Sequence, residues 1–127
     1  MAIIGSRGIV RHDHDEILQY LPDNTDTIIS GGAVGVDTIA AHFARAQGFE
    51  LIEILPDYAT HGRRAPTIRN REIVRMADFV LAIWDFVSRG TAHTIACCIE
   101  EQVPVRILGV KKPRENKKYA SILSGKD

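Results

Sequence analysis

Short apolar segments alternate with segments of helical periodicity, and this alternation is the strongest constraint on the fold. The apolar segments lie near residues 2–5, 26–30, 50–55, 78–84 and 103–108. Helical patterns lie between them, near residues 13–21, 33–47, 67–77 and 90–101. Repeated strand–helix units of this kind predict an all-parallel sheet. The apolar segments are too uniformly apolar to leave one face in water, so we expect helices on both faces of the sheet.

The chain has 127 residues, which fits one domain that folds alone. We assign residues 1–110 to this α/β domain. Residues 111–127 are basic and polar, and we expect a C-terminal tail or a short helix there.

Charge and cysteine usage narrow the class of protein. The formal net charge is zero, so no overall basic field favours nucleic acid as the partner. No apolar run approaches the roughly 20 residues of a membrane span, and the first residues already form a strand-like run, which leaves no room for a signal peptide. The two cysteines, Cys97 and Cys98, are neighbours on an expected helix and are poorly placed to pair with each other. These features predict a reduced, cytoplasmic protein without a membrane partner.

Three glycine-containing strings stand where a strand should meet a helix. They are GSR at 5–7, SGGAVGVD at 30–37 and SRGTAHT at 88–94. Such turns expose backbone N–H groups beside the positive end of a helix dipole, where phosphates bind without a metal. A doubly wound sheet of five strands in the order 3-2-1-4-5, between two helical layers, brings the turns to the carboxyl ends of the strands. The sequence therefore predicts one shared anion-binding pocket.

The same strings resemble the SLOG superfamily of Rossmann-like domains. The small YspA-like members share GSR, GGAxGVD, the pair Arg69-Asn70 and the string S-x-GT in this order, and the likeness spans about residues 3–105. Relatives include the DNA-processing protein DprA, the LONELY GUY phosphoribohydrolases and sensor domains for nucleotide-derived signals. The resemblance implies a nucleotide-like ligand, with no further cofactor, and a homo-oligomer, in the first instance a dimer.

The predicted ligand-binding residues come from these strings. Arg7 would offer a cation to a phosphate and Ser6 a hydroxyl, whereas Asp37 has either a ribose-binding or a structural role in the first turn of its helix. A loop with Pro56, Tyr58, His61 and Arg64 could close over the site. The full predicted set is Gly5, Ser6, Arg7, Gly31, Gly32, Ala33, Gly35, Asp37, Arg69, Asn70, Ser88, Gly90 and Thr91.

Catalysis stays open at this point. The phosphoribohydrolase pattern P-G-G-x-G-T-x-x-E ends on a catalytic glutamate, and the equivalent position here is Thr94. A threonine cannot replace a carboxylate in moving a proton or stabilising a cationic sugar. Asp37, Asp85 and His93 remain as substitutes. No set of His, Cys and carboxylate residues has the spacing of a metal site.

Three functions are compatible with these features. The first is binding or sensing of a nucleotide-derived small molecule, and the second is hydrolysis of the N-glycosidic bond of such a ligand. The third is binding of single-stranded nucleic acid, in which a run of arginines would follow the phosphate backbone. Within this run, Arg71 and Arg75 are expected on a solvated helix face. The arginines are Arg63, Arg64, Arg69, Arg71 and Arg75.

Overall fold

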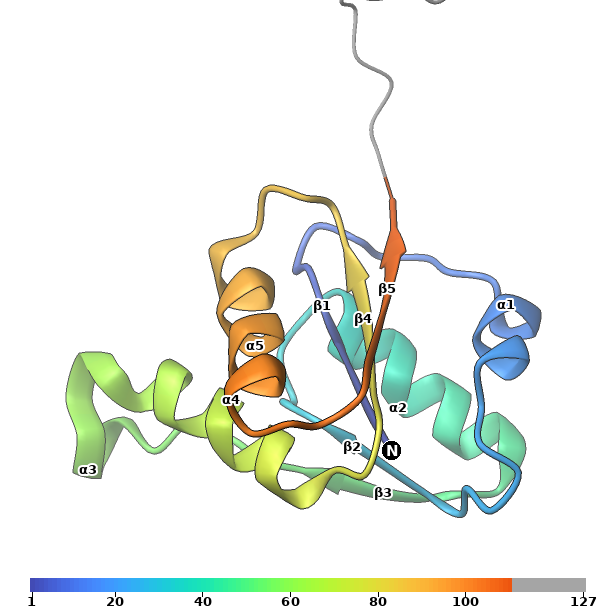
Figure 1. Ribbon diagram of the computed structural model, residues 1–127, viewed down its shortest axis with the longest axis horizontal. Helices are drawn as coiled ribbons and strands as arrows, with labels where there is room; N and C mark the ends of the chain where they lie inside the picture. The colour runs from blue at the N-terminus through green and yellow to red at the C-terminus, as the bar shows by residue number, and fades with distance from the viewer. Residues whose placement is uncertain (111–127) are drawn as a thin grey trace, which may run out of the picture.

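Five parallel strands make up the central sheet, in the order β3-β2-β1-β4-β5 (Figure 1). The strands are β1 (Ala2–Gly5), β2 (Thr27–Ser30), β3 (Glu50–Glu53), β4 (Val80–Trp84) and β5 (Val105–Gly109). This computed structural model describes residues 1–110, so the tail or helix expected at 111–127 lies outside the described residues. The predicted α/β class and strand order are confirmed.

Helices cover both faces of the sheet (Figure 1). The helices α1 (His14–Gln19) and α2 (Val36–Gln47) lie on one face, and α4 (Ala65–Met76) and α5 (Arg89–Glu100) lie on the other. Each face has its own apolar core, which includes Phe43 on the α2 side and Val74 on the α4 side. Successive side chains of β1 alternate between them, since Ile3 joins the first core and Ile4 the second.

The edge strands differ from the expectation that no strand has a side in water. The central strands β1 and β4 are buried along most of their length, as predicted. In β3, however, Glu50 and Glu53 are exposed, and in β5 Arg106 and Ile107 are exposed. Each edge strand has only one neighbour in the sheet. The prediction is therefore wrong for the two edges.

One helix boundary and one predicted loop also differ from the sequence-based expectation. Helix α2 begins at Val36 rather than near residue 33, because Gly35 has φ = 77°, outside the helical region. The segment predicted as a loop after β3 contains the short helix α3 (Tyr58–His61) and the 3₁₀ helix η1 (Gly62–Arg64). Asp57 starts α3, since its Oδ1 accepts a hydrogen bond from the Thr60 N–H at 3.1 Å.

Ion pairs join the two helices on the second face. Arg71 lies 2.7 Å from Glu100 and 3.0 Å from Glu101, and Arg75 lies 3.1 Å from Glu101. The guanidinium groups, that of Arg71 first, lower the pKa of Glu101. The two arginines therefore lie on a solvated face, as expected, and also pair with α5, which the sequence alone did not predict.

Residues 1–110 contain no helix long and apolar enough to cross a membrane. The same residues contain no cluster of three His, Cys, Asp or Glu side chains able to hold a metal ion. Cys97 and Cys98 are both buried free thiols.

Candidate functional site

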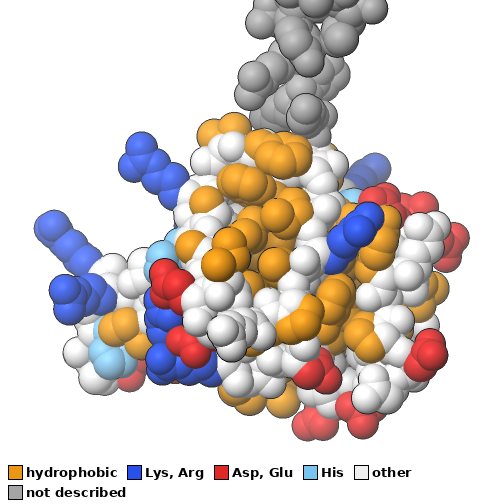
Figure 2. Space-filling view, viewed as in Figure 1, with side chains coloured by type: hydrophobic (Ala, Val, Ile, Leu, Met, Phe, Trp, Pro, Cys, Tyr) orange, Lys and Arg blue, Asp and Glu red, His pale blue; other side chains and the backbone are white. Residues whose placement is uncertain are grey.

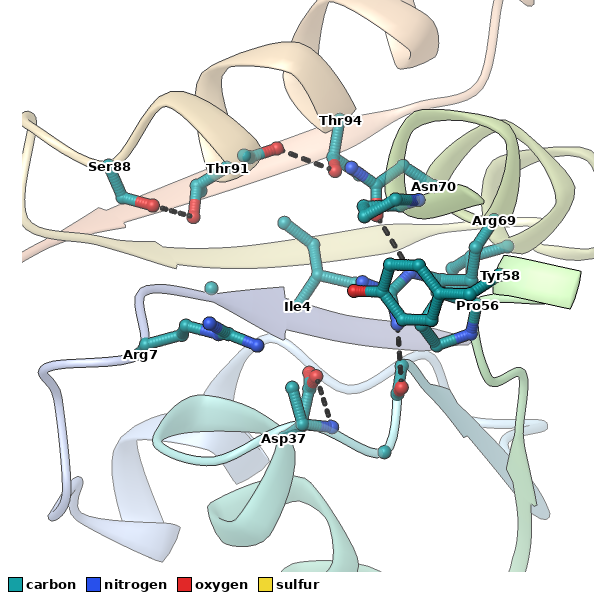
Figure 3. A pocket seen from close by; sticks show the side chains of 17 residues that line it. Ile4, Arg7, Asp37, Pro56, Tyr58, Arg69, Asn70, Ser88, Thr91 and Thr94 are labelled. Atoms are coloured by element: carbon teal, nitrogen blue, oxygen red, sulfur yellow. Dashed lines mark hydrogen bonds between the residues drawn. The ribbon is translucent and has the colours of Figure 1, made fainter. Parts of the chain in front are cut away.

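A pocket of about 470 Å³ opens at the carboxyl ends of β1 and β2, between α4 and the first turn of α5 (Figure 3). This is the edge at which parallel α/β sheets bind ligands, and the volume suits a small molecule. Eleven of the thirteen predicted ligand-binding residues line it: Gly5, Arg7, Gly31, Gly32, Ala33, Asp37, Arg69, Asn70, Ser88, Gly90 and Thr91. The strings at 5–7, 30–37 and 88–94 therefore meet in one place, as predicted.

The structure does not bring the other two residues into the pocket. Ser6 is fully buried, and its Oγ accepts a hydrogen bond from the Asp85 N–H at 3.1 Å, which ties the end of β1 to the end of β4. Gly35 lies behind Arg7, where a Cβ atom would collide with the Arg7 backbone. Both residues shape the turns around the pocket, and the expectation that the Ser6 hydroxyl faces a ligand is corrected.

Arg69 forms part of the pocket wall and is held by the protein itself. Its Nη1 donates to the carbonyl oxygen of Gly31 at 2.7 Å, and its Nε donates to Asn70 Oδ1 at 3.0 Å. The bond to Gly31 connects α4 to the turn after β2, and the bond to Asn70 lies within α4. Burial lowers the pKa of Arg69, and the nearby Asp37 carboxylate opposes that shift. The Arg69 guanidinium is thus a fixed positive charge in the pocket.

Asp37 is the buried carboxylate of the pocket. Only 9% of the residue is exposed, and its Oδ2 accepts a hydrogen bond from the Ala33 N–H at 3.0 Å. Burial raises the pKa of Asp37, against the lowering effects of this hydrogen bond and of Arg69. Gly31 makes the arrangement possible, because a Cβ atom there would lie 2.8 Å from Arg69 Nη1 and 3.0 Å from Asp37 Oδ2.

Arg7 is the exposed cation of the site. It extends from the end of β1 toward the pocket, across from Tyr58 (Figure 3). Within residues 1–110 its side chain forms no hydrogen bond and no ion pair by the usual distance criteria. Its positive charge lowers the pKa of Arg69, so the two guanidinium groups repel each other. One buried carboxylate therefore faces two cations, which favours an anionic ligand.

Hydrogen bonds outside the pocket hold the turn before α5 in place. Asp85 Oδ1 accepts hydrogen bonds from the N–H groups of Val87 at 2.9 Å and Ser88 at 2.8 Å, and these bonds lower the pKa of Asp85. The Trp84 Nε1 donates to the carbonyl oxygen of Ser88 at 3.0 Å. Asp85 is not among the residues that line the pocket, and its carboxylate holds the turn.

The first turn of α5 presents unused hydrogen-bond donors to the pocket. Ser88 occupies the N-cap position but makes no side-chain cap bond, and its Oγ accepts a hydrogen bond from the Thr91 hydroxyl at 3.3 Å. In α1 and α3, by contrast, an aspartate caps the first turn. A Cβ atom added at Gly90 would meet nothing within 4 Å. A first turn without a side-chain cap leaves its backbone N–H groups available to an anion, and Gly90 leaves room beside them.

The remaining catalytic candidates do not meet a carboxylate partner in the pocket. His93 lies in a separate hollow beside Arg71 and Arg75, with both ring nitrogens 3.8 Å from the Cys97 sulfur. Thr94 does line the pocket, and its hydroxyl donates to the carbonyl oxygen of Gly90 at 3.0 Å. Of Asp37, Asp85 and His93, only Asp37 lines the pocket.

Several lining residues were not predicted as ligand contacts. Pro66 and Ile73 share a face of α4 with Arg69 and Asn70, at the i, i+3, i+4, i+7 spacing that a helix brings to one side. That spacing was available in the sequence and would have identified both. Ile4 and Thr94 also line the pocket outside the predicted contacts. Pro56 and Tyr58 line it too, and both belong to the loop that the sequence placed over the site.

Comparisons with known proteins agree with this fold. The model of the YspA, cpYpsA-related SLOG family matches residues 2–61. The gene 61 protein of Mycobacterium phage D29 is 37% identical over 90 residues, which cover 66% of this chain and 72% of that protein.

Two solved structures share the fold. DNA processing protein A of Helicobacter pylori, described with its single-stranded DNA binding, superposes with a TM-score of 0.65 at 22% identity, over 98% of this chain and 71% of that chain. DprA of Streptococcus pneumoniae superposes with a TM-score of 0.66 at 19% identity, over 99% of this chain and 56% of that chain. The chain thus spans little more than half the length of the streptococcal protein. On the match to this family model and the 37% identity to the phage protein, this chain belongs to the YspA-related SLOG family.

Proposed function

We propose that the pocket binds a phosphate-bearing, nucleotide-derived small molecule and that the domain acts as a binding or sensing module. One observation carries the proposal: the exposed guanidinium of Arg7 and the uncapped first turn of α5 face the same pocket. A phosphate accepts hydrogen bonds from both and offsets the repulsion between Arg7 and Arg69.

The position of Asp37 supports a ligand with a sugar next to the phosphate. Its carboxylate is buried at the pocket wall and receives one backbone hydrogen bond on Oδ2. A carboxylate in this position accepts hydrogen bonds from the hydroxyl groups of a ribose, as acidic residues do in dinucleotide-binding folds. The pocket then offers cations for a phosphate and an acceptor for a sugar within one cavity.

A second candidate is single-stranded DNA. Arg63 and Arg64 are exposed on η1, close to the start of α4, where they extend the positive charge beyond the pocket. The likeness of fold to the H. pylori protein adds to this candidate. In that case one nucleotide of a strand would occupy the pocket, and affinity would fall steeply with salt concentration.

The experiment that tests the proposal is a thermal unfolding series with AMP, ADP-ribose, NAD, cyclic nucleotides, coenzyme A and a short oligonucleotide. A ligand at 100 times its dissociation constant stabilises the fold by about 2.7 kcal/mol. We expect a mononucleotide to raise the melting temperature and to be recovered unchanged. Release of free base would instead establish hydrolysis, with Asp37 as the pocket carboxylate. A shift with the oligonucleotide alone would favour the DNA candidate, and no shift with any compound would contradict the proposal.

A further inference from the structure

Tyr58 is a large aromatic side chain that the fold itself does not use. It is 59% exposed, and α3, the helix that carries it, contains no buried residue. Neither of the two apolar cores includes Tyr58. Burial in the protein therefore does not account for an aromatic ring at this position.

The local structure nevertheless holds Tyr58 at the pocket. Asp57 accepts the Thr60 N–H on its side chain at 3.1 Å and the His61 N–H on its carbonyl oxygen at 3.0 Å. The bonds from Thr60 lower the pKa of Asp57, so the cap stays charged at neutral pH. Tyr58 follows directly and lines the pocket beside Pro56 and close to Arg69 (Figure 3).

The pocket has two ends of different chemistry. Arg7, Ser88 and Thr91 lie on one side of the view in Figure 3, and Pro56 and Tyr58 lie on the other. The first end offers a cation, hydroxyl groups and the N–H groups of α5. The second end offers a proline ring and an aromatic ring, next to the Arg69 guanidinium, which already donates to Gly31 and Asn70. A ligand that fills both ends has a charged head and a flat apolar group.

We infer that Tyr58 is the stacking platform for the nucleobase of the bound ligand. The ligand is then a nucleotide with its base attached, rather than a sugar phosphate. This inference rests on the proposed function, because phosphate binding at Arg7 and α5 directs the rest of the ligand toward Tyr58. Every base has a π-face, so stacking on Tyr58 gives affinity for bases in general with little choice among them.

The test compares AMP with ribose 5-phosphate, which carries the same sugar and phosphate without a base. Dissociation constants are measured by calorimetry for the wild type and for Tyr58→Ala, Tyr58→Leu and Tyr58→Phe. Ile99→Ala removes another exposed apolar side chain, 72% exposed against 59% for Tyr58, from α5 outside the pocket and is the matched control. Because Tyr58 is exposed, its variants are expected to melt at the wild-type temperature.

Tyr58→Ala is expected to lower the affinity for AMP by about 5- to 150-fold, the loss that corresponds to one stacked base. Tyr58→Leu should lose most of the same affinity, and Tyr58→Phe should retain it because the ring remains. Ribose 5-phosphate should bind all variants equally, and Ile99→Ala should bind AMP like the wild type.

Two results would overturn the inference in distinguishable ways. If the wild type bound AMP and ribose 5-phosphate equally and Tyr58→Ala had no effect, base stacking on Tyr58 would be contradicted. The proposed binding of phosphate would still stand. If neither compound bound the wild type, both the proposed function and the stacking on Tyr58 would be contradicted.

Discussion

The turns at the ends of β1 and β2 and the turn before α5 all contain glycine, but for different reasons. In the first two, the protein itself fills the space that a side chain would need. A Cβ atom at Gly5 would collide with the carbonyl oxygen of Ile83, and one at Gly31 would press on Arg69 and Asp37. At Gly90 a Cβ atom would meet nothing within 4 Å. The comparison separates glycines that the fold requires from a glycine that leaves space for something else.

The largest effect on stability is expected for Gly5→Ala. The added methyl group meets the backbone of β4 and the side chain of Val36, neither of which can move without disturbing the sheet. Overpacking of this kind costs roughly 1–3 kcal/mol of unfolding free energy. Chemical denaturation of the variant and the wild type measures it. Wild-type stability would show that β1 and β4 adjust more easily than the structure indicates.

Gly90→Ala tests the glycine that the fold does not require. The residue is exposed in the first turn of α5, so the methyl group meets no protein atom and improves helix propensity by up to about 1 kcal/mol. The methyl group lies at the pocket, however, and obstructs the approach of a phosphate to the N–H groups. We expect a wild-type or higher melting temperature and at least about a tenfold loss of AMP affinity, near 1.4 kcal/mol. Undiminished binding would place the phosphate elsewhere.

A smaller effect, with a defined pH dependence, is expected for Asp37→Asn. Burial raises the folded-state pKa of Asp37, so the folded protein holds this proton more tightly than the unfolded chain does. The contribution of Asp37 to stability is therefore full below its unfolded pKa and is lost as pH rises through its folded pKa. Asparagine does not titrate and keeps an acceptor for the Ala33 N–H.

The Asp37→Asn variant should accordingly be more stable than the wild type at pH 7, and the difference should narrow as pH falls toward 4. Thermal melts across this range measure the difference. A difference that grows on acidification would mean that the Arg69 interaction outweighs the burial of the carboxylate.

Much of the fold followed from the sequence because its signals are local. The alternation of strand and helix patterns predicted a parallel sheet and its strand order. That order brings the glycine strings to one edge of the sheet, independently of how the side chains are oriented. Side-chain orientation is a different matter. Ser6 and Arg7 are neighbours in one string, yet Ser6 turns inward to the Asp85 N–H and Arg7 turns toward the pocket. Only the packing of β1 against β4 decides between them.

Long-range contacts account for the other differences. The sequence shows Arg71 and Arg75 at helical spacing but not that Glu100 and Glu101 stand opposite them on α5. The apolar surface around β5, seen on the face in Figure 2, likewise follows from its place at the edge of the sheet. The helical character of residues 58–64 depends on a cap at Asp57, in a segment whose composition is that of a loop.

The most direct test of the account is a paired titration of the wild type and Arg7→Ala with AMP and with adenosine. Arg7 is exposed, so the variant should fold normally. We expect Arg7→Ala to lower the affinity for AMP by at least about tenfold, near 1.4 kcal/mol, and to leave the weaker binding of adenosine unchanged. Equal affinity of the two proteins for AMP, or an equal loss for both ligands, would contradict phosphate recognition by Arg7.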